Sequence, residues 1–293
     1  MYDGWLHVKP SAIRFEGDDL MARITLGVAY DGSGFCGWQS QPSACGVQDV
    51  LEAAIAGIAQ HPVRVHAAGR TDTGVHASCQ VVHFDTASTR PISAWVRGVN
   101  ANLPETVRIE WAKEVDATFH ARFSAFSRSY EYLLYNAPVA SALMAKKSGW
   151  FHLPLDCLAM QKAAGYLIGE HDFSAFRAAE CQASSPVRTM YQAEVTQLKL
   201  AENKVYFQFN FSANAFLQHQ VRNMIGALIY IGKGAHPPEY MQTLLQNRNR
   251  TLSPPTFSPH GLYLVGVGYD AKWGLPIREY KAIDMNKNLS VLI

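Results

Sequence analysis

The densest group of polar residues in the sequence lies between two strand-like segments and contains Arg70, Thr71, Asp72, Thr73 and His76. A loop between strands is where a rigid scaffold presents catalytic groups. A carboxylate in such a loop can act as a nucleophile or as a general base. An aspartate close to a glycine is also common in an ordinary turn, because glycine adopts a positive φ without strain. Asp72 is therefore the first candidate for chemistry, and a structural turn is the alternative.

The same residues admit a second chemical interpretation. Asp72, Thr73 and Gly74 spell the Asp-Thr-Gly signature of aspartic proteases, whose chemistry needs two carboxylates that share one proton. The chain contains this triplet once, whereas a two-lobed protease needs a second copy. A dimeric protease is normally far shorter and carries apolar residues where Arg70 and Thr71 stand. The sequence disfavours a protease, which would cleave peptides with an acid optimum.

The whole string at residues 69–77, GRTDTGVHA, closely resembles the catalytic loop of the TruA family of tRNA pseudouridine synthases. A match of nine residues is specific, whereas a lone aspartate would not be. Thr73 stands where the family often has alanine, which does not touch the chemistry. The resemblance covers nearly the whole chain after Met21, and its further segments are 30–32, 37–39, 119–124, 130–132, 171–173, 216–217, 221–224 and 261–264.

The resemblance implies an α+β fold of two ferredoxin-like-derived halves, each a mainly antiparallel sheet flanked by helices, with the catalytic cleft between them. It implies isomerisation of uridine to pseudouridine at tRNA positions 38, 39 and 40, in the anticodon stem-loop. It also implies a cytoplasmic homodimer whose two subunits hold one tRNA. The reaction has no net redox change and needs no group donor, so we expect no cofactor.

Residue by residue, the resemblance makes Asp72 the essential carboxylate and Arg222 its ion-pair partner. A guanidinium beside a carboxylate favours its ionised form and fixes its orientation. Tyr130 would stack on the target base, Leu262 would close the pocket with an apolar side chain, and Arg70 would help to flip the base out. The structural alternatives are a solvated arginine, a strand tyrosine and a core leucine. Whether the carboxylate attacks C1′ of the sugar or acts as a base at C2′ stays open.

Hydrophobic periodicity gives the elements that must position these residues. Alternation over 23–30 predicts a strand, and apolar residues at i, i+3 and i+4 over 47–59 predict an amphipathic helix. On a helix over 217–232, His219, Arg222 and Asn223 share a polar strip that we expect to face a cleft. The other predicted strands are 63–66, 81–85, 107–112, 129–135, 192–200, 205–212 and 262–269, and the other predicted helices are 92–100, 155–168 and 239–246.

We divide the chain into an extension at 1–20, a first half at 21–125 and a second half at 126–293. The composition is 48% hydrophobic and 17% charged, which excludes a disordered chain. The apolar run at 224–231 is far shorter than the roughly 20 residues of a membrane-spanning helix.

Charge and cysteine usage limit the partners. Twenty-six Lys and Arg against 24 Asp and Glu give a net charge of +2, so an RNA-binding surface must be local. The five cysteines are scattered without a Cys-x-x-Cys pair, so we expect reduced thiols. The histidines lack the i, i+4 spacing of a zinc hydrolase, so we expect no metal. Candidates for a phosphate-tracking surface are Arg64, Arg122, Arg128, Lys146, Lys147, Arg177 and Arg188.

Overall fold

The computed structural model describes residues 21–201 and 204–276. The predicted extension at 1–20 and the last part of the predicted second half, 277–293, lie outside the described residues. Within them, ten strands form one sheet. Their bounds are Ala22–Tyr30 (β1), His66–Ala67 (β2), His76–Thr86 (β3), Val107–Val115 (β4), Ala125–Asn136 (β5), Gly149–Phe151 (β6), Gly169–Asp172 (β7), Val187–Ala201 (β8), Lys204–Ala213 (β9) and Leu262–Tyr269 (β10).

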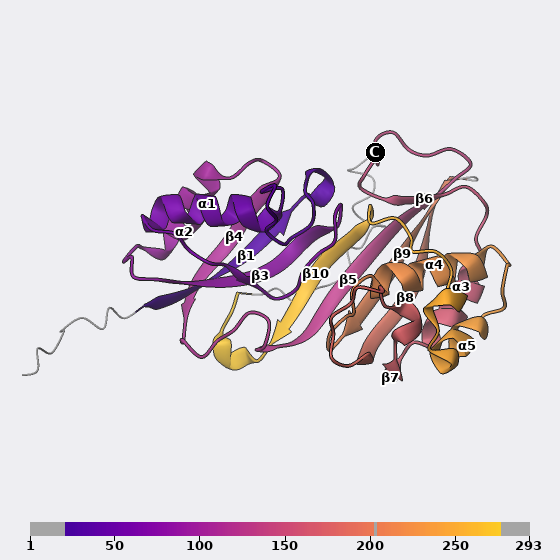
Figure 1. Ribbon diagram of the computed structural model, residues 1–293. Coiled ribbons are helices and arrows are strands. Elements are labelled where there is room, and N and C mark those ends of the chain that lie inside the picture. Colours follow the sequence, from indigo (N-terminus) through magenta and orange to yellow (C-terminus); the bar gives the residue numbers. More distant parts are fainter. Residues whose placement is uncertain (1–20, 202–203, 277–293) are drawn as a thin grey trace, which may run out of the picture.

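The strand order is β4-β1-β3-β10-β5-β9-β8-β7, with β2 beside β3 and β6 beside β5. Among the described strands, β3 with β10 and β5 with β6 are parallel pairs, and all other pairs are antiparallel. The last described strand therefore lies in the middle of the sheet, between strands that precede it by more than a hundred residues (Figure 1). The predicted α+β class with a mainly antiparallel sheet is confirmed.

Five α-helices cover this sheet in the part of the chain that the structure describes. Figure 1 shows α1 and α2 together over the N-terminal strands, and α3, α4 and α5 over β8 and β9. The α-helix bounds are Val47–Ala59 (α1), Ile92–Asn102 (α2), Cys157–Gly165 (α3), Gln220–Gly232 (α4) and Tyr240–Asn247 (α5), and the 3-10 helices are Gly32–Gly34 (η1), Ser174–Phe176 (η2), Arg250–Leu252 (η3) and Ala271–Trp273 (η4).

Two hydrophobic cores lie under the two groups of helices. The N-terminal core is built around β1, β3, α1 and α2 and contains Leu26, Phe84 and Trp95, whereas the C-terminal core surrounds α4 and contains Phe209 and Met224. A continuous sheet joins them, so the predicted boundary at 125/126 stays a prediction.

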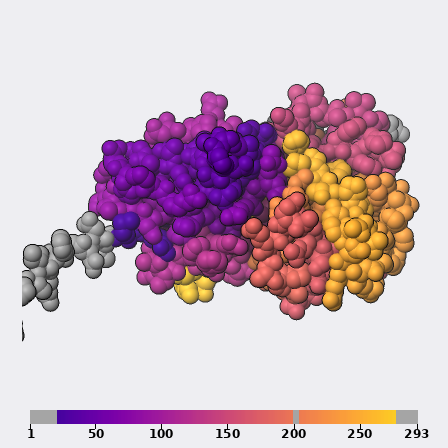
Figure 2. Space-filling model, viewed as in Figure 1, coloured from indigo at the N-terminus to yellow at the C-terminus, as the bar shows by residue number. Residues whose placement is uncertain are grey.

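Where the sheet joins the two cores, β10 and β5 contribute side chains to both of them. From β10, Leu262 packs in the C-terminal core, whereas Leu264 and Val267 pack in the N-terminal core. The ring of Tyr130, on β5, touches both cores. After β10, Trp273 on η4 packs against Phe119, and these late residues lie beneath the N-terminal part in Figure 2. The two parts of the chain are therefore interleaved rather than merely adjacent.

One cysteine pair differs from the expectation. Cys36 and Cys45 form a disulfide with their Cα atoms 5.4 Å apart, so the prediction of reduced thiols is wrong for these two. The chain folds back between them, and the amide of Cys36 donates to the carbonyl of Cys45 at 2.9 Å. Their separation of nine residues carries no recognisable motif, and only the path of this loop brings them together. The other described cysteines are free.

Candidate active site

The loop that carries Asp72 connects β2 to β3 and is fixed through its main chain. The carbonyl of Thr71 accepts a hydrogen bond from the amide of Trp38 at 3.0 Å. The Thr71 hydroxyl lies 2.8 Å from the hydroxyl of Tyr30. The amide of Val75 donates to the carbonyl of Asp72 at 3.1 Å and closes the turn. The Asp72 carboxylate, which is 28% exposed, therefore leaves a backbone with little freedom to move.

Two glycines allow the chain to follow this path. Gly74 has φ +79°, and Gly37, in the neighbouring loop, has φ +94°. A Cβ atom on Gly37 would lie only 2.7 Å from the carbonyl oxygen of Thr71. Both the positive φ and this close approach require glycine. The loop that contains Gly37 therefore packs closely against the main chain of the aspartate loop.

Arg222 reaches Asp72 from the other side. Its Nη1 donates to Oδ2 of Asp72 at 3.0 Å, across 150 residues of sequence. Its Nε donates to the carbonyl of Phe257 at 2.9 Å, and its own carbonyl accepts from the amide of Phe257 at 3.2 Å. The guanidinium is therefore held on both sides and presents one nitrogen to the carboxylate.

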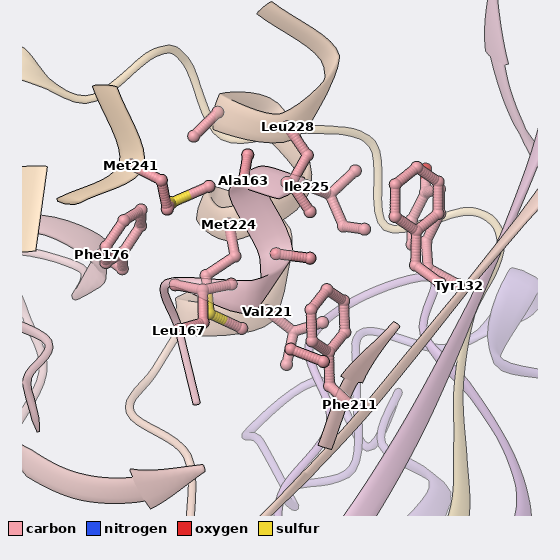
Figure 3. Close-up of a cluster of buried hydrophobic side chains, with 14 of the residues drawn as sticks. Tyr132, Ala163, Leu167, Phe176, Phe211, Val221, Met224, Ile225, Leu228 and Met241 are labelled. Carbon is pink, nitrogen blue, oxygen red and sulfur yellow. The ribbon is translucent and has the colours of Figure 1, made fainter. Parts of the chain in front are cut away.

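Helix α4 holds Arg222 in place by burying its opposite face. Figure 3 shows Val221, Met224, Ile225 and Leu228 of α4 among side chains from α3, α5 and β9. All four are 5% exposed or less. Since an amphipathic helix is oriented by its apolar face, this packing determines where the Arg222 side chain points.

His219 is a second basic side chain at the carboxylate. Its Nε2 lies 3.5 Å from the same Oδ2 of Asp72. His219 precedes α4 with φ 62°, in the left-handed region that non-glycine residues seldom occupy. The predicted polar strip included this residue without giving it a role, and the unusual backbone conformation had no signal in the sequence.

The rest of the predicted polar strip does not face a cleft. Asn223 is fully buried, and its Nδ2 donates to the carbonyl of Phe176 at 2.7 Å. Its Oδ1 accepts from Arg250 at 3.1 Å and from Thr256 at 2.7 Å. That part of the prediction was wrong, because the segment around η3 folds over the strip and uses its polar groups internally.

Tyr130 lies on β5, paired with Leu264 of β10 and Phe211 of β9. Its ring is partly buried and contacts Phe216 edge-on, with the centroids 5.2 Å apart. Burial raises the pKa of Tyr130, and the charge of the nearby Asp72 raises it further. The hydroxyl is therefore protonated at neutral pH, within electrostatic reach of the carboxylate.

Leu262 is buried, whereas Arg70 is exposed to solvent. Leu262 is 5% exposed at the start of β10, in the same core cluster as Val75 of the aspartate loop. Arg70 is exposed, two residues before Asp72. The structure thus pairs Arg222 with Asp72, places Tyr130 within electrostatic reach of that carboxylate, buries Leu262 in the C-terminal core and leaves Arg70 on the surface.

Arg128 is not a surface residue. It is 9% exposed, and its guanidinium donates to the carbonyls of Ala125 and Asn214 at 3.1 Å each, of Ala68 at 3.0 Å and of Arg122 at 2.6 Å. The prediction that it tracks phosphates is therefore wrong, because every one of these bonds binds it to the protein's own backbone. A strand-edge arginine and a buried one look alike in sequence.

The other six basic candidates differ in how exposed they are and in the partners that their side chains already have within the protein. Lys147 pairs with Asp31, and the guanidiniums of Arg177 and Arg188 donate to nearby carbonyls. The three that are exposed are Arg64, Arg122 and Lys146.

Neither a metal site nor a membrane span emerges from the described residues. Within 21–201 and 204–276, no three His, Cys, Asp or Glu side chains are placed to hold a metal ion. In the same ranges, no helix has the length and apolar character needed to cross a membrane.

Comparison with known proteins identifies the family. The family model for tRNA pseudouridine synthases matches residues 27–124 and 163–270. The tRNA pseudouridine synthase A of Methylobacillus flagellatus is 63% identical over 259 residues, covering 88% of this chain and 97% of the relative. That of Nitrosomonas eutropha is 54% identical over 267 residues, covering 90% and 95%. That of Chromobacterium violaceum is 56% identical over 257 residues, covering 87% and 96%. The resemblance seen in the sequence is thereby confirmed, and the chain belongs to the tRNA pseudouridine synthase family.

Proposed function

We propose that this protein isomerises uridine to pseudouridine in tRNA, at positions 38, 39 and 40 of the anticodon stem-loop, with Asp72 as the catalytic carboxylate. Membership of the family supports the reaction and the substrate class. One observation carries the assignment of Asp72: Arg222, 150 residues away in sequence, donates to its Oδ2 at 3.0 Å. An ion pair between two matched motifs, built by two different cores, is the arrangement that a fixed catalytic carboxylate needs.

The reaction breaks the bond between N1 of the base and C1′ of the ribose, turns the base and rejoins it through C5. The proton on C5 leaves to water and N1 takes up a proton from water, so the product is an isomer of the substrate and no redox partner or group donor takes part. The Asp72 carboxylate acts either on C1′ as a nucleophile or on the C2′ proton as a base. Both routes need the oxygen that Arg222 does not hold, Oδ1, to reach the sugar.

The neighbouring residues have roles that follow from their positions. Arg222 orients the carboxylate and balances its charge, because charge-assisted hydrogen bonds are short and directional. Tyr130 offers a ring face to the base, since an enzyme that acts on a base must stack it after taking it out of the helix. Leu262 closes the base-binding site with an apolar side chain, and Arg70 assists base flipping from the surface.

The decisive experiment measures tritium release from tRNA labelled at C5 of uridine. The wild-type protein should release tritium, and Asp72→Asn should fold and bind tRNA but release none. Asp116→Asn changes an exposed aspartate far along the chain and is the matched control, with full activity expected. Activity in Asp72→Asn would overturn the assignment. Binding without release in the wild type would favour a non-catalytic RNA-binding protein on the same scaffold.

The finer parts of the proposal have separate tests. Mapping pseudouridine in the product tRNA should place it at positions 38, 39 and 40, and product elsewhere would contradict the stem-loop assignment. We also propose that the protein is a cytoplasmic homodimer. Light scattering should give twice the chain mass of 32.4 kDa, and a monomer that retains full activity would contradict the dimer.

A further inference from the structure

The turn at 120–124 presents an aromatic ring and a guanidinium to solvent. Phe123 is 76% exposed, more than any other aromatic side chain in the described residues. Arg122 is exposed beside it, with its guanidinium carbon 5.7 Å from the centre of the Phe123 ring. The turn therefore offers a stacking surface and a positive charge side by side.

This turn is held firmly by hydrogen bonds. The amide of Ser124 donates to the carbonyl of His120 at 2.9 Å, and the amide of His120 donates to Oγ of Ser124 at 3.0 Å. The amide of Arg122 donates to Nδ1 of His120 at 3.1 Å. The amide of Ala121 donates to Nδ1 of His83, on β3, at 3.1 Å. A ring on such a support loses little conformational freedom when a ligand stacks on it.

The inner side of the Phe123 ring is supported by other rings. Phe123 and His120 have centroids 4.3 Å apart and a tilt of 33° between their planes. His120 contacts His83 at 4.7 Å, and His83 stacks on His66 at 5.0 Å. Burial lowers the pKa of His120 and lowers that of His83 to about 3, so these rings are uncharged at neutral pH. The positive charge of this patch comes from its arginines.

Arg128 connects this turn to the aspartate loop. One nitrogen, Nη2, donates to the carbonyl of Arg122 at 2.6 Å and to the carbonyl of Ala68 at 3.0 Å. The two carbonyls are therefore neighbours, although 54 positions separate them in the sequence. Ala68 lies two residues before the exposed Arg70 and four before Asp72. The turn thus stands next to the start of the catalytic loop.

We propose that Arg122 and Phe123 bind the RNA strand close to the target nucleotide: Phe123 stacks on an unpaired base, and Arg122, with Arg70, contacts adjoining phosphates. Single-stranded RNA is recognised by this combination of an aromatic ring with nearby arginines. Ring stacking tolerates any base, so this contact suits an enzyme that acts on several positions. The inference rests on the proposed function and names a second point of contact with its substrate.

The test measures binding of an anticodon stem-loop RNA whose target uridines are replaced by cytidines, so that no turnover occurs. Phe123→Ala should raise Kd by about 5- to 150-fold, the effect of losing one base stack. Phe123→Leu keeps apolar bulk without the ring and should weaken binding nearly as much. Arg122→Gln should raise Kd and reduce the slope of log K against log salt by about 1.

Matched controls separate this contact from general surface effects. Leu158, on α3, is also 76% exposed, and Leu158→Ala should leave Kd unchanged. Arg97→Gln, on the exposed side of α2, should leave the salt slope unchanged. In tritium release on uridine tRNA, Phe123→Ala should raise KM and leave kcat unaltered, because the ring does not touch Asp72.

Each failure is distinguishable. If wild type binds the RNA but releases no tritium, the catalytic proposal fails and this contact stands. If Phe123→Ala binds like wild type, or Leu158→Ala loses as much affinity, the stacking contact is wrong while the catalytic proposal stands. If wild type does not bind the stem-loop RNA, the stacking contact is wrong, and tritium release from tRNA still decides the catalytic proposal. Circular dichroism melts of the variants, expected to match wild type, exclude unfolding as the cause.

Discussion

Asp72 and Arg222 are held in contrasting ways. On the aspartate side, meaning the N-terminal core and its loops, main-chain hydrogen bonds and close glycine contacts fix residues 71–75. On the arginine side, meaning α4 and the C-terminal core, a long side chain leaves a helix whose apolar face is buried. The backbone of the aspartate side therefore sets the position of the Asp72 carboxylate, and a side chain of the arginine side supplies the positive charge beside it.

This contrast explains which substitutions each side tolerates. A changed side chain on the arginine side alters the charge at the carboxylate while the fold survives. A changed backbone on the aspartate side moves the carboxylate while its charge survives. Val75 complicates the division, because it follows the catalytic turn yet packs in the C-terminal core. The two sides are thus coupled through apolar packing as well as through the ion pair.

The largest effect should come from the arginine side. Arg222→Met removes the cation from a partly buried pair, so we expect kcat/KM to fall by about 100-fold or more. Arg222→Lys keeps the charge but loses the bond from Nε to Phe257, so its kcat/KM should lie between those of the wild type and Arg222→Met. Rates of tritium release measure this. The control is Arg248→Met, whose exposed pair with Asp172 is 3.6 Å long and should matter little. If Arg222→Met and Arg248→Met lost the same factor in kcat/KM, the pairing of Arg222 with Asp72 would have no specific role in catalysis.

A smaller effect should follow from moving the backbone on the aspartate side. Gly37→Ala places a methyl group 2.7 Å from the carbonyl of Thr71 at φ +94°. We expect about 1 to 3 kcal/mol less stability and about a tenfold loss of kcat/KM. Gly34→Ala is the matched control, because nothing lies within 4 Å of its added Cβ. Urea unfolding and tritium release report the two effects. An active and stable Gly37→Ala would contradict the idea that backbone contacts set the position of Asp72.

The third effect concerns pH, disappears near neutral pH and also distinguishes the two sides. Among the described residues, the buried histidines are His76 and His83, both on β3 of the aspartate side. Burial lowers the pKa of His83 to about 3, against about 6.5 when unfolded. The unfolded chain then binds more protons between these values, so stability falls as pH drops below about 6.5. His83→Gln should flatten the curve by at most about 1.4 kcal/mol per pH unit. Urea melts from pH 7 to 4 measure it, and an unaltered slope would refute the assignment.

Much of the fold could be predicted from periodicity. The helix over 47–59 and the strand over 262–269 have the bounds that the structure gives them, because both carry an uninterrupted apolar pattern. The strands at Gly149–Phe151 and Gly169–Asp172 were not predicted, since three or four residues are too few to show alternation. The predicted helix over 155–168 is shorter in the structure, where it begins at Cys157 after the cap residue Asp156 and ends at Gly165.

The candidate site was accessible to sequence reasoning only in part. Motif resemblance pointed to Asp72, Arg222 and Tyr130, which the structure brings together, while their roles remain proposals. It could not separate Arg128 from the exposed arginines, because burial of a cation depends on carbonyls contributed by distant segments. Nor could it give a role to His219, whose approach to Asp72 depends on a left-handed backbone. These features arise from long-range packing, which no local pattern encodes.

The central place of β10 has a consequence for how the molecule is made. A ribosome synthesises β3 and β5 well before β10, so until residue 262 emerges both strands have an open edge facing the gap. Strands with free edges invite pairing with other chains. The aspartate side lacks Leu264 and Val267 of its own core, and cannot be joined to the arginine side, until Leu262–Tyr269 has entered the sheet. Assembly of the active site is therefore among the last steps of folding, and a nascent chain that stalls before β10 would have both ends of the ion pair but no sheet to unite them.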